Sequence, residues 1–260
     1  MSADLLAAAE AWLAADPDEQ TRAELTEVLA GARNGDDAAL ADLHDRFDSR
    51  LVFGTAGLRG RLGAGPNRMN RVVVAQTTAG LARFLLGREA TPSVVIGYDG
   101  RRNSAVFARD AAELLAGAGV RAILLPRLLP TPVLAFAVRH LDASAGVMVT
   151  ASHNPADDNG YKLYLGGADG GSQIVPPADS EVLAAIEAVV AEGAAGAELA
   201  RSDDYETAGE EVLDAYVVAT AGERAVDAPL TWVYTPLHGV GWETASRVFS
   251  GAGIPDPIPV

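Results

Sequence analysis

The sequence predicts an α/β fold, a three-layer α/β/α sandwich around a mostly parallel mixed sheet, followed by the start of a second, similar domain. First, short apolar segments that suit strands alternate with longer amphipathic segments between residues 70 and 149. Second, the connections between these segments are short, which favours a parallel sheet with helices on its faces. Third, a strand, a glycine loop and a helix ending in GAG occur at 93–119 and again at 230–253.

Residues 1–48 are expected to form a helical extension that precedes the sheet. Asp16 is expected to be the N-cap of a second helix, with Pro17 at its first position. A short third helix is expected in DDAALADLHDRF, residues 36–47. In the first helix, four residues share one face at helical spacing: Leu5, Ala9, Trp12 and Leu13.

Residues 49–203 are expected to form the first α/β domain. Ser104 is expected to cap one of its helices, and Thr131 to cap another that has Pro132 at its first position. Ligands of such folds bind beyond the carboxyl ends of the strands, where Ser152 would lie. The predicted helices are 70–87, 104–119 and 131–141, and the predicted strands are 93–100, 120–126 and 145–149.

Residues 204–260 are expected to form a second domain that is incomplete. A helix at 210–222, a strand at 230–236 and a helix at 242–253 repeat part of the plan of the first domain. One strand with two helices cannot bury its faces, and the sequence stops at IPDPIPV, where another strand should begin. We therefore expect this sequence to be one piece of a longer protein.

The composition narrows the possible function classes. A net charge of −15 argues against nucleic-acid binding, because phosphate backbones require clustered cations. No apolar run is long enough to cross a bilayer, and the acidic N-terminus does not suit a signal peptide. Without cysteine there is no disulfide, thiol nucleophile or thiolate metal site. We expect a soluble cytoplasmic protein without nucleic-acid or membrane partners, and the oligomeric state stays open.

Two polar loops offer candidate anion ligands. FGTAGLRGRLGAGPNRMN, residues 53–70, has five glycines that would let backbone N–H groups approach an anion, with Arg59 and Arg61 adding charge. A flexible glycine turn is the alternative. GYDGRRNS, residues 97–104, offers Arg101 and Arg102 either as anion ligands or as braces against Asp99.

A third loop, TASHNP at residues 150–155, directly follows a buried strand. It lacks the G-x-S-x-G pattern of triad hydrolases, and an ordinary turn or helix cap is an alternative. However, Ser152 and His153 lie close in the sequence to Lys162, which is the only lysine in the chain. A hydroxyl, a proton acceptor and cations are the groups that phosphoryl transfer needs.

TASHNP and NGYKLY, together with FGTAGLRG, resemble the α-D-phosphohexomutases, which include phosphoglucomutases, phosphomannomutases and their phosphopentomutase relatives. YDGRRNS, GSQIVPP and TPLHGVG occur in the order of the family, so the resemblance covers about residues 48–258. The leading AWLAADPDEQTRAEL resembles a branch with a longer N-terminal part, which includes phosphopentomutases and sugar-bisphosphate synthases.

The resemblance implies a phosphotransferase of the isomerase class that interconverts 1-phospho and 6-phospho hexoses through a phosphoserine and a bisphosphate intermediate. Pentose phosphates are the alternative substrates. The implied cofactors are Mg²⁺, bound in part through the phosphate on Ser152, and a hexose 1,6-bisphosphate as activator. The implied catalytic residues are Ser152, His153, Lys162 and Arg59. The implied ligands of the substrate and its phosphate are Thr55, Gly57, Arg101 and Arg102.

The sequence departs from the family pattern at the metal site. Family members hold Mg²⁺ with three aspartates of a D-G-D-x-D loop, and this sequence has no such loop. We therefore expect the 260-residue chain to be inactive by itself. A non-catalytic sugar-phosphate-binding module and an inert interaction fragment are the alternatives.

Overall fold

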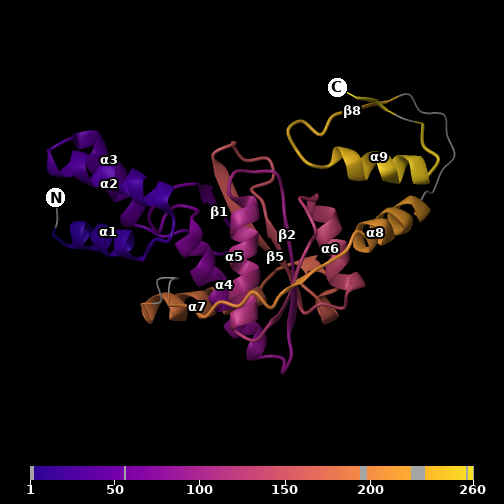
Figure 1. Ribbon diagram of the computed structural model, residues 1–260, viewed down its shortest axis with the longest axis horizontal. Coiled ribbons are helices and arrows are strands. Elements are labelled where there is room, and N and C mark those ends of the chain that lie inside the picture. Colours follow the sequence, from indigo (N-terminus) through magenta and orange to yellow (C-terminus); the bar gives the residue numbers. More distant parts are fainter. Residues whose placement is uncertain (1–2, 56, 194–197, 224–231, 256, 260) are drawn as a thin grey trace.

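A computed structural model describes residues 3–55, 57–193, 198–223, 232–255 and 257–259 (Figure 1). Its centre is a seven-stranded sheet in the order β1-β5-β4-β2-β3-β7, with β6 paired to β5. The strands are β1 (Leu58–Arg61), β2 (Ser93–Tyr98), β3 (Arg121–Leu124), β4 (Ala145–Val149), β5 (Asp158–Leu165), β6 (Ser172–Gln173) and β7 (Glu206–Thr207).

The sheet is mixed, with a single reversed strand. β2 pairs in parallel with β3 and β4, and β3 pairs in parallel with β7. β5 is antiparallel to each of its neighbours β1, β4 and β6. Six of the seven strands therefore share one direction, and the predicted fold class is confirmed.

Helices cover both faces of this sheet (Figure 1). The larger core cluster joins one face to α4 (Arg71–Leu86), α5 (Ser104–Gly117) and α7 (Ala178–Ala191). A second cluster joins the opposite face to α6 (Thr131–His140) and α8 (Glu211–Gly222). Side chains alternate along a strand, so adjacent residues such as Val94 and Val95 are buried in the core clusters on opposite faces of the sheet. Within the described residues, no helix combines the length and the apolar character that a membrane span requires.

The first domain continues beyond the expected boundary between residues 203 and 204. β7 extends the sheet, with Thr207 opposite Leu124 of β3. Val212 and Leu213 of α8 are buried in the same cluster as Met148 of β4. The first unit therefore includes α8. The two-residue strand β7 has no pattern of its own, and its pairing with β3 is what defines it.

The second unit is small in the described part of the chain. α9 (Trp242–Gly251) lies beside β8 (Val233–Tyr234), which pairs in parallel with β9 (Ile258–Pro259). Residues 230 and 231 of the expected strand lie outside the described residues. Arg127 of the first domain donates hydrogen bonds to Glu210 at 2.8 Å and to Glu243 at 2.7 Å. This arginine therefore links the loop after β3 to α8 and α9.

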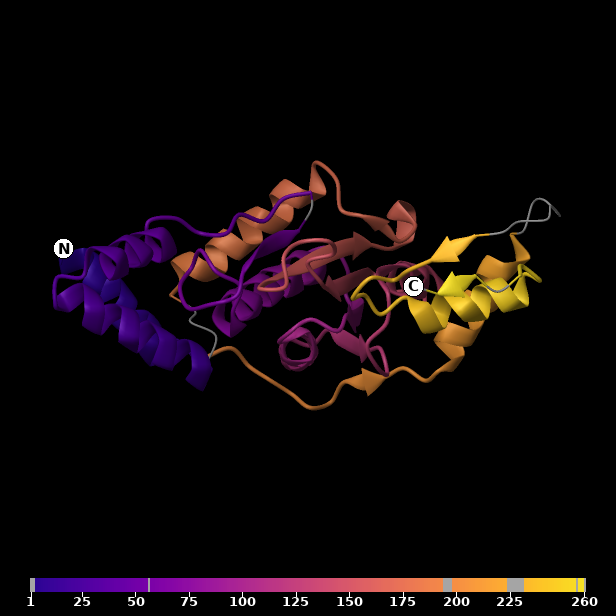
Figure 2. The same ribbon diagram turned by 90° about the horizontal axis from the view of Figure 1, so that it is seen from above.

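The N-terminal extension forms three helices, as expected: α1 (Ala3–Ala15), α2 (Glu19–Arg33) and α3 (Asp37–Phe47). Figure 2 shows them at the opposite end of the molecule from α9. The N-cap of α2 is Asp18, which accepts a hydrogen bond from Gln20 N, and not the expected Asp16. Asp16 is buried instead, and its carboxylate accepts a hydrogen bond from the Thr21 hydroxyl at 2.6 Å.

Two other expected caps are each displaced by one residue. The N-cap position of α5 is Asn103, in the left-handed conformation with φ of 66°, and Ser104 begins the helix. The Ser104 hydroxyl donates to Asp99 at 2.7 Å, so a contact from another strand end determines its role. At α6 the cap position is Pro130, and Thr131 is the first helical residue.

The N-terminal helices pack against the glycine-rich segment that follows β1 and form hydrogen bonds with it. The N–H of Ala64 donates to Glu24 at 3.2 Å, and its carbonyl accepts from Arg46 at 3.2 Å. A side chain at Gly63 would place its Cβ 3.2 Å from the Arg46 guanidinium, and one at Gly65 would lie 3.0 Å from Arg46 Cβ. Both glycines also have positive φ. They therefore serve close packing against the helices rather than the expected approach to an anion.

Arg46→Met is expected to lower the free energy of unfolding by about 2–3 kcal/mol. The Arg46 side chain is 8% exposed and pairs with Glu24 and Asp42 while it bonds the Ala64 carbonyl. Urea unfolding measures the change. The matched control is Arg33→Met, which removes an ion pair with Glu10 between half-exposed side chains and should change stability by less than about 1 kcal/mol. Equal effects of the two substitutions would contradict this account.

Candidate functional site

The serine turn, residues 150–155, begins where β4 ends. β4 is buried throughout, and Ser152 lies three residues beyond its last residue, Val149. Ser152 is exposed and has φ of 57°, a left-handed conformation that costs about 1–2 kcal/mol for residues other than glycine. Backbone strain of this kind persists only where the surroundings impose it, and it is common at functional sites. No described residue forms a hydrogen bond with Ser152 Oγ, which leaves it open to a ligand.

The amide side of Ser152 is held through Thr150 and Asp99. Ser152 N donates to Thr150 Oγ1 at 2.9 Å, and that hydroxyl donates to Asp99 Oδ2 at 2.6 Å. Asp99 Oδ1 accepts from the Ser104 hydroxyl at 2.7 Å and from Arg101 N at 3.0 Å. The Asp99 carboxylate, directly after β2, therefore fixes the Thr150 hydroxyl that accepts the hydrogen bond from the Ser152 amide.

Arg101 holds the carbonyl side of the same turn. Its guanidinium donates to the carbonyl of Ser152 at 2.7 Å and to three others, those of Asn154 at 2.8 Å, Pro155 at 2.7 Å and Asp158 at 3.0 Å. The sequence left open whether Arg101 binds an anion or braces the loop. These four contacts are those of a residue that braces the loop.

Two cations meet on the sheet face beside the serine turn. Arg59 of β1 lies opposite Gly160 of β5, two residues from Lys162. Arg59 donates one bond to Asn154 Oδ1 at 3.1 Å, and its buried Nε has no hydrogen-bond partner among the described residues. Burial lowers the pKa of Lys162 from its ordinary value of 10.5, the charge of Arg59 lowers it further, and Asp99 opposes the change. Two neighbouring cations with an unused donor favour an anionic ligand.

The remaining expected ligands are placed differently. Thr55 is exposed in the turn that joins Gly54 to Gly57, and its carbonyl accepts from Gln173 at 2.8 Å. Gly57 N donates to Gly54 O at 2.7 Å, and a Cβ at Gly57 would lie 2.1 Å from the Tyr161 carbonyl. Close packing on β5 thus requires this glycine, and its N–H is already engaged. An anion-binding role of Thr55 and Gly57 stays a prediction.

His153 and Arg102 lie at the outer side of the turn. His153 is exposed, directly after Ser152. Arg102 is 61% exposed at its side chain and lies 3.7 Å from Asp157. Both side chains are free to reach a bound molecule, and their expected roles stay predictions.

Sequence reasoning did not identify Thr150 and Asp99 as parts of the site. Thr150 could have been identified from its position two residues before Ser152, because a threonine hydroxyl often accepts a hydrogen bond from the N–H of the residue two positions later in a turn. Asp99 has a weaker signal: it is an acid directly after a buried strand, and that strand is next to the one that leads into the serine turn. Asn159 is fully buried, and its side-chain amide donates to the Ser104 hydroxyl and the Arg102 carbonyl, so it holds the segment between β2 and α5.

The described residues do not fit a magnesium site on their own. They contain no group of three or more His, Asp or Glu residues that could hold a metal ion. Asp99, a carboxylate bonded into the serine turn, is already used by Thr150, Ser104 and Arg101. The expected metal ligand, a phosphate on Ser152, stays a prediction.

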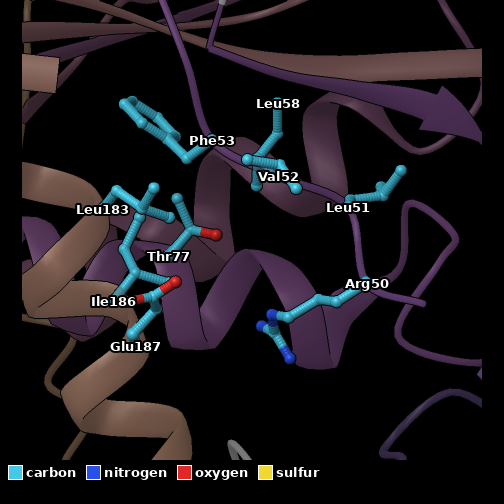
Figure 3. Close-up of a pocket in the computed structure, with 9 residues that line it drawn as sticks. All are labelled: Arg50, Leu51, Val52, Phe53, Leu58, Thr77, Leu183, Ile186 and Glu187. Carbon is cyan, nitrogen blue, oxygen red and sulfur yellow. The ribbon is translucent and has the colours of Figure 1, made fainter. Parts of the chain in front are cut away.

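A separate cavity of about 100 Å³ lies on the other face of the sheet (Figure 3). Segment 50–53, Thr77 of α4 and residues of α7 line it, together with Leu58 of β1. Arg59 follows Leu58 along β1, and neighbouring side chains in a strand point to opposite faces. The cavity is therefore not part of the site at Ser152.

The chain matches the model of one protein family over residues 50–192. That family is described as phosphoglucomutase/phosphomannomutase, alpha/beta/alpha domain I. The matched range contains every residue that we predicted for the site, and it covers more than half of the 260 residues.

Individual relatives carry related names. A probable phosphomannomutase of Haemophilus influenzae is 56% identical over 192 residues, which is 73% of this chain and 39% of the relative. A phosphoribomutase of Saccharomyces cerevisiae is 38% identical over 91% of this chain and 40% of its own length. The crystal structure of a putative phosphomannomutase from Thermus thermophilus superposes with a TM-score of 0.60 at 31% identity, over 82% of this chain and 46% of that one. The chain spans about two fifths of the length of these curated relatives.

Proposed function

Because this chain belongs to the phosphoglucomutase/phosphomannomutase family, we propose that it is the phosphoserine-bearing part of a sugar-phosphate mutase. The observation that carries the proposal is the serine turn. Ser152 is exposed at a strand end, its strained backbone is held from both sides, and its Oγ is open, while Arg59 and Lys162 supply positive charge nearby. Rigid placement of a nucleophile favours accurate transfer.

In the proposed reaction, Ser152 carries the phosphoryl group and donates it to a free hydroxyl of a sugar monophosphate. The bond from phosphorus to Ser152 Oγ breaks as a bond to the sugar oxygen forms. His153 accepts the hydroxyl proton and returns a proton to the departing Ser152 Oγ. The bisphosphate then returns its other phosphoryl group to Ser152 Oγ. The Ser152 hydroxyl gives up its proton in this step, and a proton is delivered to the sugar oxygen that is freed. Lys162 and Arg59 offset the charge of the transferring group.

The proposed substrates are hexose 1- and 6-phosphates. A pentose phosphate is the second candidate, since the yeast relative that covers 91% of this chain is named a phosphoribomutase. A hexose 1,6-bisphosphate as the phosphate donor, magnesium as a cofactor and a cytoplasmic location belong to the proposal as well.

Phosphate labelling tests the proposal. The full-length protein is used, because the 260-residue chain is expected to be inactive by itself. It is incubated with glucose 1,6-bisphosphate labelled in its phosphates, and the modified peptide is mapped by mass spectrometry. One phosphoryl group on Ser152, and release of that group to glucose 1-phosphate or ribose 1-phosphate, is the expected result. Binding of the bisphosphate without any transfer would instead identify a non-catalytic sugar-phosphate-binding module.

The rate of phosphoryl transfer to Ser152 is expected to fall as pH rises through the lowered pKa of Lys162, below 10.5. Transfer requires the ammonium form, and Lys162→Arg should keep its charge and remove this fall below pH 10.5. The free energy of unfolding should instead increase as pH rises. The unfolded state binds the Lys162 proton more tightly than the folded state, so stability rises with pH between the lowered pKa and 10.5. A pH–rate profile without this basic limb in the wild type would contradict the assigned role.

A further inference from the structure

We infer that Asp99, acting through the Thr150 hydroxyl, is a positioning residue that sets the backbone conformation of Ser152 and so the direction of its Oγ. The inference rests on the proposed function, because a fixed Oγ matters only if Ser152 accepts and donates a phosphoryl group. Neither Asp99 nor Thr150 needs to touch the sugar phosphate for this role.

The first step of the argument is the direction of the hydrogen bonds. Thr150 Oγ1 has one proton, and the 2.6 Å contact to Asp99 Oδ2 uses it, because an ionised carboxylate can only accept. The lone pairs of Thr150 Oγ1 then face the Ser152 amide, which donates at 2.9 Å. Without Asp99, the hydroxyl could rotate and present its proton to that amide.

The second step is the fixed position of Asp99 itself. Its other oxygen accepts from the hydroxyl of Ser104, the first residue of α5, at 2.7 Å and from the Arg101 amide in the loop before α5 at 3.0 Å. The Arg101 Nε lies 3.4 Å from Asp99 Oδ2. Asp99 therefore transmits the position of the α5 N-terminus to the serine turn, and Thr150 is 3% exposed, so water does not replace its contacts.

The third step is the strain of Ser152. A serine with φ of 57° returns to a more favourable conformation unless both of its peptide groups are held. The Arg101 guanidinium holds its carbonyl at 2.7 Å, and Thr150 holds its amide. Release of the amide frees one side of the residue, and Oγ then moves with the backbone.

The chain offers a matched control for this device. Leu237 also has a positive φ, 53°, and its amide donates to Thr235 Oγ1 at 3.0 Å. The turn therefore has the same threonine spacing and the same hydrogen bond as the serine turn. It follows β8, a strand that is not part of the seven-stranded sheet that carries the serine turn. Thr235→Val removes the same hydroxyl from the same kind of turn.

The experiment compares single-turnover labelling of Ser152 by glucose 1,6-bisphosphate in four versions of the full-length protein: wild type, Thr150→Val, Thr150→Ser and Thr235→Val. Thr150→Val keeps the shape of the side chain and removes the hydroxyl, and its labelling rate should fall roughly 10- to 100-fold. Thr150→Ser restores the hydroxyl and should recover the rate to within about threefold. Thr235→Val should label at the wild-type rate. Thermal melts of all four proteins separate slow labelling from loss of fold.

The outcomes distinguish this inference from the proposed function. Wild-type labelling at Ser152 with an equally fast Thr150→Val would overturn the inference and leave the proposed function standing. Absence of labelling in the wild type would overturn both. If Thr150→Val does not fold, Asp99→Asn gives the second test. Its amide NH₂ would have to face either the Ser104 and Arg101 donors or the Thr150 proton, so slower labelling is expected, and an unchanged rate would also overturn the inference.

Discussion

In the full-length protein, replacement of Ser152 by alanine is expected to reduce mutase turnover by more than about 10⁴-fold, because the nucleophile is lost. The fold should not change. No described residue bonds Ser152 Oγ, the side chain is exposed, and its two backbone contacts do not depend on the side chain. Turnover of glucose 1-phosphate, together with a thermal melt, measures both effects.

A second substitution at this position separates strain from chemistry. Ser152→Gly removes the same hydroxyl and also the Cβ that makes the left-handed conformation costly. We expect Ser152→Gly to be more stable than Ser152→Ala by roughly 1 kcal/mol, while both are inactive. This difference would show that the backbone conformation of a functional residue lowers the stability of the folded protein. Equal stability of the two variants would mean that the turn is not strained, and measurable turnover in either would exclude Ser152 as the phosphate carrier.

The parts of the site that the sequence predicts are those encoded by neighbouring residues. The buried segment 145–149 ends three residues before Ser152, so period and length identify both the strand and the serine at its end. The helices before and after β2 were predicted to within a few residues for the same reason. Hydroxyl, imidazole and lysine close together in the sequence also indicated phosphoryl chemistry before any geometry was known.

The parts that the sequence does not predict depend on contacts between distant segments. Gly63 and Gly65 look like an anion cradle, yet Glu24 and Arg46 of the extension occupy the space beside them. Ser104 looks like a helix cap, yet Asp99 takes its hydroxyl. In each case the local pattern admits two explanations, and a partner from another element decides between them.

Arg101→Lys is expected to lower the rate of Ser152 labelling by at least about 100-fold and the free energy of unfolding by about 3 kcal/mol. The planar guanidinium reaches four carbonyls of the serine turn at 2.7 to 3.0 Å. A lysine ammonium carries three donors on a single nitrogen and cannot reproduce this spread. The Arg101 side chain is 15% exposed, so solvent would not replace the lost bonds in full.

The adjacent residue is the control, because it has the same chemistry in a different environment. Arg102→Lys changes a side chain that is 61% exposed, with one ion pair at 3.7 Å, and should alter stability by less than about 0.5 kcal/mol. A rate loss at Arg102 without loss of stability would indicate that it contacts the substrate phosphate, as the sequence predicted. At Arg101 the two losses should occur together, because the carbonyls that it holds belong to the turn that carries Ser152. Loss of rate at Arg101 with full stability would instead favour direct contact with the phosphate, and the brace would then not be its main role.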